Sequence, residues 1–143
     1  GPALIWEPLN DLGRLRLKGN DLEGAKRLFE LAREVIQASG DARGEVAVMG
    51  NMSALAVAQN DLDAAQQALR RAIKVARSSG QIKPLAKLKH NHGLLLLRQH
   101  QPELAEEAFI ESDALSQELD WREGLALNSA QLRRLRAAKA HEP

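Results

Sequence analysis

The hydrophobic and polar positions along the chain alternate in the pattern of amphipathic helices. Between residues 22 and 38 the apolar residues are spaced three and four apart, which places them on one face of a helix. The same spacing elsewhere predicts helices over residues 6–18, 22–38, 44–58, 61–78, 84–99, 102–118 and 122–138. We therefore expect an all-α fold.

This pattern repeats every forty residues. Small, alanine, large and turn positions keep their register across copies: Gly13, Ser53, Gly93; Ala25, Ala65, Ala105; Phe29, Leu69, Phe109; Asn20-Asp21, Asn60-Asp61; Ser39-Gly40, Ser79-Gly80. Unrelated helices would not preserve such a register. The sequence predicts three helix pairs, over residues 6–40, 44–80 and 84–119. A single capping helix over 122–138 follows them and has a polar outer side.

The residues between the helices predict how the helices begin and end. Asp21 and Asp61 stand where an N-cap side chain accepts a backbone N–H, and Gly40 and Gly80 stand at C-cap positions. Pro84 and Pro102 are expected at the first position of their helices.

The repeated positions resemble the tetratricopeptide repeat family. That family has a small residue in the first helix of each pair and an alanine–large–alanine trio in the second, here Ala25/Phe29/Ala32, Ala65/Leu69/Ala72 and Ala105/Phe109/Ser112. The repeat is longer than the common 34 residues, and the early Trp and Tyr and the closing Pro are missing. In this it is similar to the extended repeats of cell-polarity scaffolds, kinesin light chains and bacterial regulators. The resemblance implies a right-handed superhelical solenoid of antiparallel pairs, as one domain over residues 1–143.

The resemblance also implies a protein–protein interaction scaffold, in which the first helix of each pair lines a concave groove that holds a peptide or protein segment. Matching the columns gives these groove candidates: Asn10, Asp11, Arg14, Asn51, Ala54, Lys87, His90, Asn91, Leu94, Arg98, Gln131 and Arg134. Asp11, Asn51, Asn91 and Gln131 form one column that could hydrogen-bond the backbone of an extended peptide. The alternative interpretation is that these residues cap turns or solvate the surface.

Charge along the candidate groove suggests the chemistry of the partner. Lys87, His90 and Arg98, with Arg134 beyond them, predict a partner that presents an acidic group or a C-terminal carboxylate. The alternative is a solvated charged face. The middle of the groove, with Ala54, is small and apolar, and it would accept an apolar side chain or a second copy of the protein.

Two other functions remain open at this stage. One is self-association through an exposed apolar surface of the first helix, at Leu4, Ile5, Leu9 and Leu12. The other, which is less favoured, is a nucleic-acid adaptor that uses the basic run Arg133–Lys139. That run lacks interleaved aromatic residues. Trp6 and Trp121 are expected to pack the terminal helices rather than to anchor a partner.

Composition narrows the remaining choices. Aromatic residues make up only 3% of the chain, and 20 basic residues nearly balance 19 acidic ones, so no strong field recruits nucleic acid or an anionic membrane. There is no cysteine, no HExxH, no Gly-rich phosphate loop and no GxSxG, and His90 and His92 point in different directions on a helix. We therefore expect no enzyme activity, no cofactor and no metal.

Two expectations concern the whole protein. No apolar stretch approaches the roughly 18–20 residues that span a bilayer, so we expect no membrane partner and a cytoplasmic location. Gly1 and Pro2 look like the remnant of a cleaved tag, and the domain is expected to be a module of a longer protein.

Overall fold

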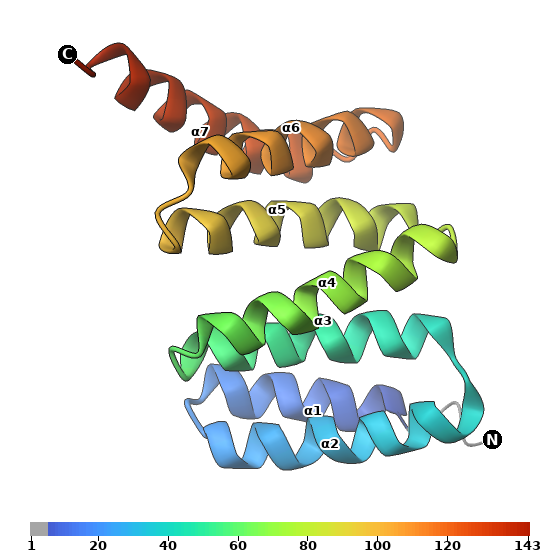
Figure 1. Cartoon of the computed structure of the whole chain (residues 1–143). Helices are drawn as coiled ribbons and strands as arrows, with labels where there is room; N and C mark the ends of the chain where they lie inside the picture. The colour runs from blue at the N-terminus through green and yellow to red at the C-terminus, as the bar shows by residue number, and fades with distance from the viewer. Residues whose placement is uncertain (1–5) are drawn as a thin grey trace. The chain divides into compact units, whose positions relative to one another are not determined.

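A computed structural model describes residues 6–143, and within this range the chain forms seven α-helices and no strand. The helices are α1 (Trp6–Lys18), α2 (Leu22–Ser39), α3 (Ala42–Ala58), α4 (Leu62–Ser78), α5 (Ile82–Arg98), α6 (Pro102–Glu118) and α7 (Arg122–Ala140) (Figure 1). Contacts divide the chain after Gly80 into two compact units. The first unit holds α1–α4, and the second holds α5–α7.

The predicted helices are confirmed, with small shifts at their ends. α1 and α6 have the predicted bounds, whereas α3 and α5 each begin two residues earlier than predicted. The expectation that Pro84 opens a helix is wrong, because α5 begins at Ile82 and Pro84 is its third residue. The N–H groups of a first helical turn have no partner within the helix, so a proline there removes no hydrogen bond.

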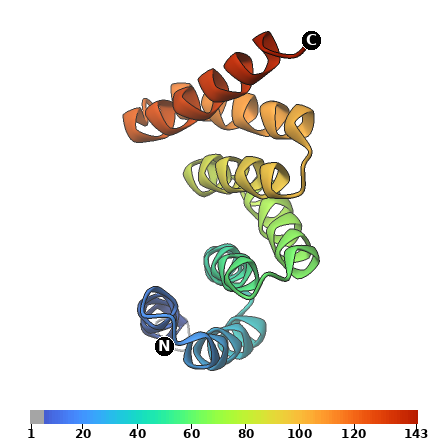
Figure 2. The ribbon, with the colours of Figure 1, turned by 90° about the vertical axis from the view of Figure 1, so that its left-hand side faces the viewer.

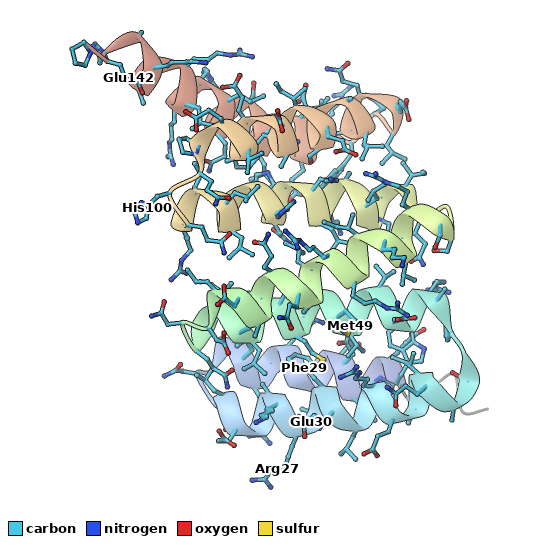
Figure 3. All side chains as sticks on the ribbon, viewed as in Figure 1. Arg27, Phe29, Glu30, Met49, His100 and Glu142 are labelled. Carbon is cyan, nitrogen blue, oxygen red and sulfur yellow. The ribbon has the colours of Figure 1, made fainter. Side chains whose placement is uncertain are left out.

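The core of the first unit forms around Phe29. Phe29 is fully buried with Trp6, Ile36, Val48 and other apolar side chains, and Figure 3 shows it inside the helices while Arg27 of the same helix projects outward. A Cβ atom added to Gly13 would lie 2.5 Å from Cε1 of Phe29. Glycine in α1 therefore lets the Phe29 ring approach the backbone closely.

The second unit repeats this contact. Phe109 is fully buried in a core with Leu96, Ala105, Ala108 and Leu132, and a Cβ atom on Gly93 would lie 2.5 Å from Cε1 of Phe109. In this unit α6 packs against both α5 and α7, and Figure 2 shows α7 lying along α6.

The middle pair solves the same packing problem with different residues. Ser53 and Leu69 stand in α3 and α4 at the positions of the glycine and the phenylalanine, and both are buried. The Ser53 hydroxyl donates a 2.8 Å hydrogen bond to the Ala65 carbonyl. Serine is larger than the glycine of the other pairs, and leucine is smaller than their phenylalanine. The two changes offset each other, so the volume between the two helices stays filled.

The helix N-termini differ between the units. In the first unit Asp21, Asp41 and Asp61 cap α2, α3 and α4, and each carboxylate accepts hydrogen bonds from first-turn N–H groups. The predicted caps at Asp21 and Asp61 are therefore confirmed. In the second unit the same positions are Gln81, Gln101 and Trp121, and none makes a side-chain cap hydrogen bond.

The loops share one backbone feature. Every twentieth residue adopts a left-handed conformation with positive φ, namely Asn20, Gly40, Asn60, Gly80, His100 and Asp120. Such a residue reverses the chain at the end of a helix, and Gly and Asn adopt this conformation at the least cost. His100 projects outward from the loop between α5 and α6 (Figure 3).

Candidate functional site

In the first unit, two of the candidate residues, Asn10 of α1 and Asn51 of α3, are hydrogen-bonded to each other. Asn51 Nδ2 donates a 2.8 Å hydrogen bond to Oδ1 of Asn10, and Asn10 is buried. The amide of Asn51, predicted to contact a partner, is therefore already engaged within the fold. Asp11, Arg14 and Ala54 are exposed.

Trp6 packs in the core of the first unit. Its indole is buried, and Nε1 donates a 2.9 Å hydrogen bond to Oδ2 of Asp41, so the interpretation of Trp6 as a packing residue is confirmed. Burial acts to raise the pKa of Asp41, but hydrogen bonds from Gly44 N–H, Trp6 Nε1–H and Arg43 N–H outweigh it. The pKa of Asp41 is therefore lowered from 3.8.

In the second unit, α5 and the start of α7 line an open hollow of about 210 Å³. Three of its lining residues, Lys87, His90 and Asn91, are sequence-predicted candidates from α5. The other lining residues come from the N-cap and first two turns of α7: Trp121, Glu123, Gly124 and Leu127. The prediction thus named the α5 side of the hollow and missed the α7 side.

The remaining candidates of the second unit do not line this hollow. Leu94, Arg98 and Arg134 are exposed on α5 and α7, and Gln131 is half-buried on α7. Of the four basic residues that were expected to cluster, Lys87 and His90 line this hollow, whereas Arg98 and Arg134 do not.

Sequence reasoning also missed a chain of buried polar groups behind His90. Nδ1 of His90 lies 2.8 Å from Oδ1 of Asn128, and Asn128 Nδ2 donates a 2.9 Å hydrogen bond to the Ser112 hydroxyl. Ser112 in turn donates to the Ala86 carbonyl at 2.7 Å. One signal could have revealed Asn128 as a buried polar residue, because it occupies a position in the apolar stripe between Leu125 and Leu132.

Within residues 6–143, no group of three His, Cys, Asp or Glu side chains could hold a metal ion. In the same range no helix has the length and apolar character required to cross a membrane.

A model of the tetratricopeptide repeat family matches residues 6–78, just over half of the sequence. The chain belongs to the tetratricopeptide repeat family. The family resemblance seen in the sequence is thereby confirmed, and so is the helical-repeat class of the fold.

Two solved structures support the tetratricopeptide fold at low sequence identity. The N-terminal domain of stress-induced protein-1 (STI-1) from C. elegans matches with a TM-score of 0.68 and 19% identity, covering 92% of this chain and 97% of that one. BtubC (BKLC) from P. vanneervenii matches with a TM-score of 0.68 and 14% identity, covering 100% of this chain and 67% of that one. The comparison with curated protein sequences gave no match.

Membership of the tetratricopeptide repeat family indicates a general role. Repeats of this family generally mediate protein–protein interaction, and family members typically act as scaffolds rather than as enzymes. A protein partner is therefore the expected ligand class.

Proposed function

We propose that this chain is an interaction scaffold, and that the exposed faces of α1 and α3 in the first unit, or of α5 and α7 in the second, bind a segment of a partner polypeptide. We call these four helices, which are the first helix of each pair and the single helix α7, the first-of-pair helices. The observation that carries the proposal is the hollow beside α5, because Lys87, His90 and Asn91, which the family resemblance placed on the partner-binding face, line it together. A preformed concavity with a few convergent polar groups is the usual form of a recognition site.

The charge of this hollow supports an acidic partner. Lys87 lines it, Lys83 lies one turn earlier on the same helix, and Glu123 is the acidic residue among its lining. A partner segment that carries a carboxylate, on a side chain or at its C-terminus, would pair with these lysines.

A capture experiment tests the proposal. The chain is immobilised beside an Asn91→Ala/Lys87→Glu variant, and captured polypeptides from a lysate of the source cells are identified by mass spectrometry. Both residues are exposed, so the substitutions should leave the fold intact. We expect one polypeptide that the wild type captures and the variant loses.

The matched control is Gln67→Ala, an exposed amide on α4, which is not a first-of-pair helix. It should capture the same polypeptide as the wild type. Equal capture by all three proteins would contradict binding through these faces.

Self-association is the second candidate, and one observation favours it. Leu15 on α1 is 65% exposed, whereas Leu55 and Leu95, at the same repeat position, are 5% and 3% exposed. Leu12 is exposed beside Leu15, whereas Leu9 is half-buried and packs against the first core. Leu4 and Ile5, which were also predicted on this surface, lie outside the described residues.

Sedimentation equilibrium distinguishes this second candidate. If copies associate through α1, Leu15→Ser should shift the protein to the monomer, and Leu31→Ser on α2 should not. A wild-type protein that is monomeric at high concentration would exclude this candidate.

A further inference from the structure

The hollow of the second unit has an apolar wall formed by the start of α7. Leu127 is 44% exposed there, and the Trp121 ring lies over Gly124 so closely that a Cβ atom at Gly124 would overlap it. Exposed leucine and indole surface in a concavity of about 210 Å³ favours an apolar side chain, because burying that surface gains free energy. The volume fits one side chain of leucine or phenylalanine size.

Two cations stand over the same indole. The Nζ atoms of Lys83 and Lys87 each lie 5.7 Å from the centroid of the Trp121 ring. The quadrupole of the ring attracts both ammonium groups and holds them near the apolar wall. An acidic residue next to the bound apolar side chain would meet these two lysines.

The hydrogen bonds behind His90 determine which of its nitrogen atoms carries the proton. A carbonyl oxygen only accepts, so Ser112 must donate its proton to Ala86 and must accept from Asn128 Nδ2. Asn128 therefore turns Oδ1 toward His90, and Nδ1 of His90 must carry a proton to donate. In the neutral ring, Nε2 is then an acceptor.

The ring of His90 is held in place from a second side. Its centroid lies 5.3 Å from that of the buried Phe109 ring, at a tilt of 56°. With Nδ1 engaged by Asn128 and the ring packed on Phe109, Nε2 is the nitrogen that remains for a ligand in the hollow. Nε2 can therefore accept a hydrogen bond from a ligand that carries an N–H or O–H group.

We propose that this hollow binds an extended peptide segment in which an apolar side chain stands next to an acidic residue. The apolar side chain packs on Trp121 and Leu127, the acidic one pairs with Lys83 and Lys87, and Nε2 of His90 accepts a backbone N–H of the segment. Asn128 is a positioning residue that fixes the His90 tautomer. The inference rests on the proposed function, since it names what the second unit recognises in the partner.

The test uses capped hexapeptides of the sequence Ser-Gly-X-Asp-Gly-Ser, with X as Leu, Phe or Ser, and a fourth peptide with X as Leu and Lys in place of Asp. Both ends are blocked, so capture of a terminal carboxylate cannot contribute. Each peptide is titrated into the full ¹⁵N-labelled chain, and ¹H–¹⁵N spectra report where it binds. We expect saturable shifts at the Trp121 indole and at the Gly124 and Asn91 amides with the Leu and Phe peptides. The Ser and Lys peptides should bind about tenfold more weakly.

Variants of the protein separate the contributions. Leu127→Ser should lower the affinity for the Leu peptide about tenfold. Leu104→Ser, which removes a leucine that is 49% exposed on α6, should bind as the wild type does. His90→Phe should lose affinity, whereas His90→Gln retains an acceptor and should recover part of it.

The His90 tautomer is measured independently of peptide binding. Long-range ¹H–¹⁵N spectra of the unbound wild type should show His90 protonated at Nδ1, and Asn128→Leu should abolish that preference if it folds. An Nε2-protonated His90 in the wild type would overturn the acceptor role without requiring the variant.

The remaining outcomes separate this inference from the proposed function. Equal affinity for the Leu and Ser peptides would overturn the inference, as would shifts confined to residues 6–80. Shifts confined to α1 and α3 would leave the proposed function standing, because those are also first-of-pair helices. No saturable shift anywhere with any peptide would count against both.

Discussion

The two units use the same helix-pair packing but finish the surface of their first-of-pair helices differently. In the first unit the third residue of α3, Gly44, lies against the side chains of Trp6 and Ile36. The Trp6 side chain is buried there, and its indole N–H is hydrogen-bonded to Asp41, the N-cap residue of α3. This indole therefore packs inside the unit.

In the second unit the equivalent glycine, Gly124, also lies under an indole, but that indole is Trp121 at the N-cap of its own helix. Ser116 stands where the first unit has Ile36, and Trp121 stands where it has Asp41. The α7 helix therefore lacks the carboxylate cap of α3 and has a half-exposed aromatic wall beside a hollow. The proposed binding site thus lies where one repeat departs from the pattern of the others, as functional sites commonly do.

The largest predicted effect tests what the units share. Gly93→Ser should clash with Phe109 and destabilise the chain by about 1–3 kcal/mol, because the added atoms have no space. The middle pair combines Ser53 with Leu69, so adding Phe109→Leu should recover part of the loss. Urea denaturation of the two single variants and the double variant gives the coupling energy.

The coupling energy from these three variants tests whether Gly93 and Phe109 pack as one unit. Additive losses would show that the glycine–phenylalanine contact is not a shared unit of packing. The matching change in the first unit, Gly13→Ser with Phe29→Leu, should give a coupling of the same sign.

The next prediction exchanges caps between the units. Asp61→Gln should cost about 1 kcal/mol, because the N–H of Ala64 loses its 3.1 Å acceptor. Gln101→Asp should gain up to about 1 kcal/mol, since it supplies a carboxylate at an N-cap that lacks a side-chain hydrogen bond. Thermal unfolding of each variant measures both changes. A loss of stability from Gln101→Asp would show that the missing carboxylate at this N-cap does not limit the stability of the second unit.

The smallest predicted effect concerns pH and belongs to the first unit alone. The pKa of Asp41 is lowered in the folded state, so on acidification the unfolded state takes up this proton first. The carboxylate therefore stabilises the fold above about pH 4, and this contribution disappears as the pH falls through the lower, folded pKa.

Asp41→Asn should accordingly flatten the loss of stability below about pH 4 relative to the wild type. Trp6→Phe removes one of the hydrogen-bond donors and should reproduce part of that flattening. Urea midpoints at several pH values check both variants, and an unchanged acid slope in Asp41→Asn would rule out this carboxylate as the source.

The fold could be predicted from the sequence because it depends on local and periodic signals. Apolar spacing located the helices, and the register of Gly13, Ser53 and Gly93 identified the pairs. Helix starts were missed where the cap was not part of the forty-residue repeat pattern: Asp41 caps α3, which begins two residues before its predicted start. The single domain over residues 1–143 stays a prediction.

The candidate site could be predicted only on its α5 side. Repeat positions identified Lys87, His90 and Asn91, because α5 keeps the forty-residue pattern. Trp121 breaks that pattern, and the contribution of Asn128 depends on a serine sixteen residues earlier, which no periodicity reveals. Similarly, the buried partner of Asn51 lies forty-one residues away, at Asn10.

The polar chain from Ala86 through Ser112 to Asn128 also has a dynamic consequence. It links α5, α6 and α7, so α7 cannot detach without breaking a buried hydrogen bond near its middle. Beyond Leu135 every residue of α7 is exposed. Amide hydrogens from Leu125, the first in α7 that is bonded to a backbone carbonyl, to about Leu132 should therefore exchange only when the whole unit opens, while those of the last turn exchange through local fraying.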